Sequence, residues 1–223
     1  MTKIAVIFYS ATGNVRAMAE AVAEGAIDTG AEVRLREVRE LSEELLISQR
    51  QYWGRHRSVL PLLPAAELAD LDWADGFAFG SPTRFGNVAA QLKIFLDQAG
   101  ELWQNGRLAN KAATAFTSSR SAHGGQEATI LALANTLYHW GVIIVPLGYT
   151  VREAIDGGGN PYGASFTSGR SVSGPDESTL IVARSQGARL TQVARALAAA
   201  RNNGDLTQSA RSSTLKRDIA GER

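Results

Sequence analysis

The sequence predicts an α/β protein built on a doubly wound parallel sheet, with helices on both faces of the sheet. Apolar runs of strand length alternate along the chain with segments whose apolar residues recur every three or four positions. Three of the runs are almost continuously apolar, which is typical of strands that are covered by helices on both faces. A length of 223 residues suits one domain with a well-buried core.

Each predicted element follows from one of these two patterns. Five apolar runs are expected to form strands: Ile4–Tyr9, Val33–Val38, Gly76–Gly80, Ala113–Thr117 and Val142–Leu147. Four segments with apolar residues at helical spacing are expected to form helices: Val15–Thr29, Val88–Gly100, Gln126–Trp140 and Asp176–Arg201.

Three segments depart from this alternation. Residues 41–64 are rich in Glu, Arg and Gln and close with Pro61 and Pro64, so we expect a partly helical excursion there. Residues 156–175 are dense in Gly, Ser and Asn, and a loop of this length in a compact domain is usually functional. Residues 203–223 show no apolar period, so we expect a domain of residues 1–202 followed by a mobile polar tail.

Composition and charge exclude several classes of function. The chain has no cysteine, which excludes disulfides, thiolate catalysis and zinc sites with cysteine ligands. Its net charge of +1 gives no field that would attract nucleic acid or an anionic membrane. The apolar run at the N-terminus is far shorter than the ~20 residues of a membrane span, and the three histidines are too scattered for a metal site. We expect a cytoplasmic protein with no metal, membrane or nucleic-acid partner.

The first predicted strand ends in a loop with the features of a phosphate-binding site. The segment Ser10-Ala11-Thr12-Gly13-Asn14 separates this strand from a helix that begins near Val15. Unpaired amides at a helix N-terminus carry roughly half a positive charge. Polar side chains add donors, and the glycine lets a phosphate approach the backbone. The lysine-containing P-loop pattern and the GxGxxG pattern are both absent, and an ordinary capped turn is the alternative.

Two more polar loops follow the third and fourth predicted strands. They are Ser81-Pro82-Thr83-Arg84-Phe85-Gly86-Asn87 and Thr117-Ser118-Ser119-Arg120-Ser121-Ala122-His123-Gly124-Gly125-Gln126-Glu127. Ligands of doubly wound sheets bind at the carboxyl ends of the strands, where these loops meet the first one. A planar heteroaromatic ligand suits them, with ring-edge bonds to the amides of Thr83 to Phe85 and charge stabilisation by Arg84. Taken alone, Arg84 would be a surface ion-pair residue and Phe85 a packing residue.

Further motifs occur in a fixed order along the chain. They are Phe95-Leu96-Asp97-Gln98, Leu102-Trp103, Gly124-Gly125-Gln126-Glu127, Val145-Pro146-Leu147-Gly148-Tyr149 and Pro161-Tyr162-Gly163-Ala164. Together with the loops they resemble the WrbA-type NAD(P)H:quinone oxidoreductases, which are flavodoxin-like proteins that bind FMN. The resemblance extends from about Lys3 to Gln192. It implies a flavodoxin-like sheet of five parallel strands in the order 2-1-3-4-5.

The resemblance implies FMN as cofactor and assigns roles to residues. The FMN phosphate would be held by Ser10, Ala11, Thr12, Gly13, Asn14 and Val15. The flavin ring would be lined by Pro82, Thr83, Arg84, Phe85, Gly86 and Asn87, and on its other side by Ser118, Ser119, Arg120, Ser121, Gly124 and Gly125. Trp103 would lie in the pocket that nicotinamide and quinone share. His139 and Trp140 would approach the flavin of a neighbouring subunit in a homotetramer, and core packing is the alternative for all three residues.

The function implied by the resemblance is reduction of a small-molecule quinone by NADH or NADPH through FMN. Nicotinamide and quinone would occupy the site in turn, in a two-electron ping-pong cycle that needs no obligatory acid–base residue. Three alternatives stay open: a flavodoxin-type electron carrier, a non-catalytic flavodoxin-fold interaction protein, and a reductase of azo or metal compounds. Carriers tend to be strongly acidic, whereas this chain is nearly neutral. Departures from the family at Thr12, Arg120 and Trp140 bear on acceptor choice and nicotinamide affinity.

Overall fold

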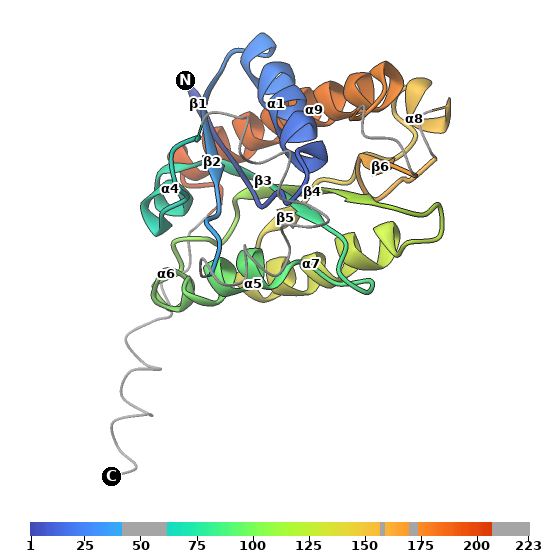
Figure 1. Cartoon of the computed structure of the whole chain (residues 1–223). Coiled ribbons are helices and arrows are strands. Elements are labelled where there is room, and N and C mark those ends of the chain that lie inside the picture. Colours follow the sequence, from blue (N-terminus) through green and yellow to red (C-terminus); the bar gives the residue numbers. More distant parts are fainter. Residues whose placement is uncertain (42–61, 157–158, 170–173, 207–223) are drawn as a thin grey trace.

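Parallel strands form one sheet at the centre of the computed structural model, which describes residues 1–41, 62–156, 159–169 and 174–206 (Figure 1). The order is β2-β1-β3-β4-β5, and β6 pairs with β4 outside this series. The bounds are β1 Thr2–Phe8, β2 Ala31–Glu37, β3 Gly76–Pro82, β4 Ala112–Ser119, β5 Ile143–Ile144 and β6 Ser165–Thr167. All of these pairings are parallel. The expected strand order 2-1-3-4-5 is therefore confirmed.

Helices cover both faces of the sheet (Figure 1). Their bounds are α1 Asn14–Asp28, α4 Leu68–Trp73, α5 Ala90–Asp97, α6 Gly100–Gln104, α7 Gln126–Trp140, α8 Glu153–Asp156 and α9 Glu177–Asn202. α1 and α9 lie on one face, and α5, α6 and α7 lie on the other. Side chains alternate along β1, so that Ile4 and Val6 join the core beneath α1 and α9, while Ala5 and Ile7 join the opposite core. A strand buried on both faces has to be apolar throughout, which is the pattern that the sequence shows.

The predicted strand Val142–Leu147 is wrong in its extent. Only Ile143–Ile144 pairs with β4 as a strand. Pro146 has no N–H to donate to a ladder, and Gly148 turns the chain with a φ of 61°. The carboxyl end of β4 pairs instead with β6, which lies inside the segment expected to be a loop. The carboxyl end of β4 therefore borders a strand that sequence patterns did not predict.

The other predicted strands and helices are confirmed to within a few residues. Gln126–Trp140 matches α7 in both bounds, whereas Val88–Gly100 contains α5 and only the first residue of a separate short helix, α6. The short helices α4 and α8 were not predicted. The predicted excursion falls largely on residues 42–61, and the predicted mobile tail on residues 207–223; both ranges lie outside the described residues. The domain boundary at residue 202, where α9 ends, stays a prediction.

A membrane-spanning helix and a metal-binding cluster are both absent from the described part of the chain. None of its helices is long and apolar enough to cross a membrane. Within the same residues, no three His, Asp or Glu side chains lie close enough together to hold a metal ion.

Candidate functional site

Three loops meet at the carboxyl edge of the sheet because β1, β3 and β4 are parallel neighbours. The first loop joins β1 to α1, the second follows β3, and the third joins β4 to α7. All the residues predicted to bind the cofactor lie in these loops or at the strand and helix ends beside them. They are Ser10, Ala11, Thr12, Gly13, Asn14 and Val15 in the first group, Pro82, Thr83, Arg84, Phe85, Gly86 and Asn87 in the second, and Ser118, Ser119, Arg120, Ser121, Gly124 and Gly125 in the third.

Ser10 organises the first loop. Its side chain is buried, and its Oγ accepts hydrogen bonds from the N–H groups of Gly13 (3.1 Å) and Arg16 (3.3 Å). Gly13 precedes α1 with a φ of 91°, which glycine adopts without side-chain strain. The first turn of α1 contains no acidic residue, and the first N–H groups of a helix have no acceptor within it. The side chain of Ser10 thus engages two N–H groups of the loop, and the N-terminus of α1 presents the positive end of a helix to an anion bound there.

The second loop contains a tight turn with a strained residue. Arg84 N donates to Asn87 O (2.8 Å), and Asn87 N donates to Arg84 O (3.0 Å). Between them Phe85 and Gly86 have φ values of 54° and 78°, the pair of positive angles that a type I′ turn requires. A bulky residue rarely adopts this conformation, and the Phe85 ring is fully exposed, so packing within the chain does not account for it. A strained and exposed aromatic residue is typical of a functional site.

The second and third loops are held together by the hydroxyl of Thr83 and by a close approach of their backbones at Gly86 and Gly125. Thr83 Oγ1 accepts from Gly86 N (3.2 Å) and from the hydroxyl of Thr129 (2.8 Å), and it donates to Gly124 O (3.2 Å). A Cβ atom added at Gly125 would lie 2.8 Å from the Cα of Gly86. Gly125 also has a φ of 90°. Only glycine at position 125 therefore allows the two loops to approach so closely.

The third loop folds on itself around a glutamine. Gln126 Nε2 donates to Ser121 O (3.1 Å), and its Oε1 accepts from Gly124 N (3.1 Å). The hydroxyl of Ser119 also donates to Ser121 O (2.6 Å). Gln126 belongs to the quoted GGQE motif but was not predicted as a site residue. Its role is to fix the loop from the first residue of α7.

The side chain of Arg84 belongs to a polar network that sequence reasoning missed. Its guanidinium lies beside the phenol of Tyr9 and the carboxylate of Glu40. Burial lowers the pKa of Arg84 below its usual value, and the two neighbours partly offset this effect, so the guanidinium stays charged. Tyr9 donates to Glu40 Oε1 (2.5 Å), while Gln91 Nε2 donates to Tyr9 Oη (3.2 Å) and to Glu40 Oε2 (2.8 Å). The one available signal was a tyrosine that ends a buried strand at the ligand edge.

The predicted substrate residues lie at the other end of the fold. His139 and Trp140 close α7, and at 1.5 Å per residue His139 is about 20 Å along the helix from Gln126. Trp103 is 37% exposed, and its Nε1 donates to His139 O (2.6 Å). Trp140 is only 7% exposed and meets the Phe79 ring edge-on, with centroids 6.1 Å apart. Within one chain these three residues therefore stand apart from the three loops, and core packing accounts for Trp140.

Comparisons with known proteins agree with this geometry. The chain matches the family described as NADPH-dependent FMN reductase over residues 2–155. A curated relative from Deinococcus radiodurans, named NAD(P)H dehydrogenase (quinone), is 45% identical over 165 residues, which is 74% of this chain and 82% of the relative. A relative of the same name from Sinorhizobium fredii is 43% identical over 203 residues, covering 89% of this chain and all of the relative.

Solved structures of similar proteins have a flavodoxin fold. The flavodoxin, WrbA-like protein from Agrobacterium tumefaciens has a TM-score of 0.63 at 28% identity, covering 88% of this chain and 99% of that one. A flavodoxin from the domain Archaea has a TM-score of 0.57 at 17% identity, covering 87% of this chain and 99% of that one, and it supports the fold alone. The chain thus belongs to the flavodoxin-like NADPH-dependent FMN reductase family and, within it, to the WrbA-type NAD(P)H:quinone oxidoreductases.

Proposed function

We propose that this chain is an FMN-dependent NAD(P)H:quinone oxidoreductase that reduces quinones by two electrons in ping-pong order. The family and the names of its relatives support the activity. The observation that carries the proposal in this structure is the first loop, where Gly13 turns the chain into α1 and no acidic side chain occupies the first turn of the helix, as a site for an anion requires. We also propose the cytoplasm as its location, because a cysteine-free chain has no need of an oxidising compartment.

The residues present fit FMN. The first loop suits a phosphate, and the adjoining loops offer polar backbone and the exposed ring of Phe85 to a planar group. When bound, FMN supplies the two-electron chemistry that links a nicotinamide to a quinone. In this proposal Ser10 to Val15 hold the phosphate, Thr83 and Phe85 orient the ring, and Arg84 places a positive charge beside it. Gly125 keeps the second and third loops in contact.

We further propose a homotetramer in which Trp103 and His139 serve the flavin of a neighbouring subunit. Their distance from the loops of their own chain supports this arrangement, because a pocket wall has to come from elsewhere. Exposed apolar side chains on the same layer of helices also support it. They are Ile94 on α5 and Leu131 and Tyr138 on α7.

A flavin titration tests the cofactor site. Flavin-stripped protein is titrated with FMN, FAD and riboflavin, and the quenching of flavin fluorescence is measured. We expect FMN to bind tightly and riboflavin much more weakly, because riboflavin lacks the phosphate. Ser10→Ala should weaken FMN binding by about tenfold to a hundredfold, the value of one or two hydrogen bonds to a charged group. Riboflavin binding should be unaffected by this change.

Two results would redirect the proposal. If no flavin binds, a flavodoxin-fold interaction protein becomes the better account. If FMN binds but NADH and NADPH are consumed with quinone only when a separate reductase is added, the chain is an electron carrier. Initial rates at varied donor and quinone concentrations then test the order of the reaction. Parallel double-reciprocal lines support a ping-pong cycle, and converging lines contradict it while leaving the reductase activity in place.

A further inference from the structure

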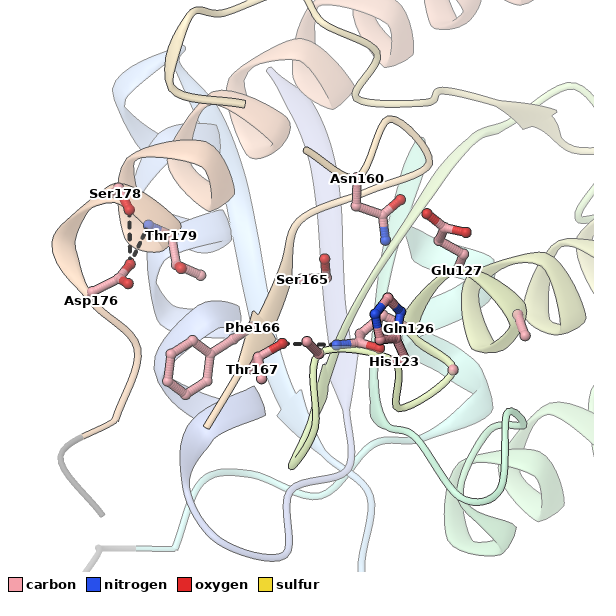
Figure 2. A pocket seen from close by; sticks show the side chains of 13 residues that line it. His123, Gln126, Glu127, Asn160, Ser165, Phe166, Thr167, Asp176, Ser178 and Thr179 are labelled. Carbon is pink, nitrogen blue, oxygen red and sulfur yellow. Dashed lines mark hydrogen bonds between the residues drawn. The ribbon is translucent and has the colours of Figure 1, made fainter. Parts of the chain in front are cut away.

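A pocket of about 560 Å³ lies between the third loop, β6 and the start of α9 (Figure 2). Its volume is within the range of about 300–1,000 Å³ that is typical of small-molecule sites. Of the residues predicted to bind FMN, only Gly125 borders it. The pocket is therefore separate from the proposed flavin site, although the third loop forms a wall of both.

Asn160 directs an unpartnered donor into this pocket. Its side chain is 6% exposed, and its Nδ2 is the buried side-chain polar atom without a hydrogen-bond partner among the described residues. Its Oδ1 accepts from Tyr162 N (3.1 Å), which fixes the orientation of the amide because a flipped amide would set two donors against each other. Figure 2 shows the amide nitrogen pointing into the pocket. An unsatisfied buried donor is costly, so a ligand oxygen at this point would be strongly favoured.

The charges around the pocket are negative. Glu127, in the first turn of α7, and Asp176, the N-cap of α9, both line it. The backbone N–H of Thr179 holds the pKa of Asp176 below its usual range, so this carboxylate is ionised at neutral pH. No lysine or arginine occurs among the described residues that form the lining. Phosphate and carboxylate ligands are therefore disfavoured, and an uncharged ligand with hydroxyl groups is favoured.

We propose that the pocket binds the vicinal diol of an uncharged sugar. One hydroxyl would accept from Asn160 Nδ2, and its neighbour would donate to the carboxylate of Glu127. A hydroxyl serves as both donor and acceptor, so a diol satisfies the two groups at once. Carboxylates bind ribose hydroxyls in the same manner in dinucleotide sites.

Binding of small probes to the full chain in its FMN-loaded form tests the proposal. The probes are adenosine, 2′-deoxyadenosine and D-ribose, and binding is measured by ligand-observed NMR and by calorimetry. We expect 2′-deoxyadenosine to bind at least about tenfold more weakly than adenosine, because it lacks one hydroxyl of the diol. Adenosine binding much more tightly than ribose identifies a nucleoside as the source of the diol. Equal binding of the two identifies a free sugar.

Two isosteric variants test the named residues. Asn160→Asp keeps the bond to Tyr162 N and removes the donor, and Glu127→Gln keeps the shape and removes the charge. Each should weaken adenosine binding about tenfold. Glu101→Gln, which alters the exposed first-turn carboxylate of α6, is the matched control and should have no effect.

Other results would overturn the inference. They are equal binding of adenosine and 2′-deoxyadenosine, no binding of any diol at millimolar concentration, or unchanged binding by Asn160→Asp. The FMN content and melting temperature of each variant show whether it is folded. These readouts also separate a failure of this pocket from a failure of the flavin site, because FMN binding does not involve Asn160 or Glu127.

Discussion

Arg84 lies half-buried beside the carboxylate of Glu40, and this carboxylate offsets part of the field that the guanidinium exerts on the proposed flavin site. Glu40→Gln keeps an acceptor for the hydroxyl of Tyr9 and removes the negative charge. We expect it to raise the reduction potential of bound FMN by on the order of 20 mV, because a more positive field favours the reduced flavin. The potential is measured by titration against reference dyes. Glu32→Gln, at an exposed position on β2, is the control, and an unchanged or lower potential in Glu40→Gln would contradict the proposed role.

A side chain at position 125 is expected to disturb the contact between the second and third loops and to lower the stability of the fold. The positive φ of Gly125 and the 2.8 Å approach of an added Cβ to the Cα of Gly86 give Gly125→Ala two separate costs. We expect a loss of about 1–3 kcal/mol in the free energy of unfolding and weaker FMN binding. Gly204→Ala is the matched control, since Gly204 has a φ of 82° and nothing within 4 Å of an added Cβ. Equal losses in urea unfolding for the two variants would show that the contact with Gly86 has no energetic weight.

At the scale of elements, prediction succeeded where the signal is local in the sequence. α7 was predicted with both bounds because its apolar period ends in Gly141, which has the positive φ of a helix C-cap. The three loops could be located because parallel strands present their carboxyl ends at one edge. The split of the last strand and the bonds among Tyr9, Glu40 and Gln91 could not be predicted, because they join residues that are distant along the chain. Asn160 was missed for the same reason.

A buried lysine from another segment donates to the last carbonyls of helix α4, and its titration makes the stability of the fold depend on pH. Lys111 is 4% exposed, and its Nζ donates to the carbonyls of Leu71 (2.8 Å) and Asp72 (2.9 Å) at the C-terminal end of α4. Burial lowers the pKa of Lys111 to about 8 from the usual 10.5. Between these two values the unfolded state binds more protons than the folded state, so the contribution of this residue to stability rises as pH rises.

Replacement of this lysine measures the effect. Relative to Lys111→Met, the wild type should gain up to roughly 3 kcal/mol in the free energy of unfolding between pH 7.5 and pH 10.5, the value of a shift of this size. Urea unfolding at several pH values provides the measurement. Lys93→Met removes an exposed lysine that is paired with Asp97 on α5. Its free energy of unfolding should change with pH in the same way as that of the wild type. If the free energy of unfolding of Lys111→Met changes with pH as that of the wild type does, Lys111 does not titrate in the folded protein between pH 7.5 and pH 10.5.

At the scale of the whole molecule, the two halves of the proposed active site lie at opposite ends of one chain. The three loops occupy the carboxyl edge of the sheet, and Trp103 is bonded to His139 at the far end of α7. A doubly wound fold fixes this separation, because a helix that starts at the ligand edge must end at the other edge. If both ends serve one flavin, they have to come from different subunits related by symmetry.

Mixed oligomers provide a direct test of this arrangement. One chain carries Ser10→Ala with Gly125→Ala, which disables its flavin loops, and the other carries Trp103→Ala, which leaves FMN binding intact. Each variant alone should reduce quinone slowly. In a co-expressed mixture with random assembly, about a quarter of the sites combine intact loops with an intact Trp103 from a neighbour, so turnover should rise towards a quarter of the wild-type value. A mixture that shows only the average of its two parents would place the whole site within one chain, because no pairing of subunits could then restore it.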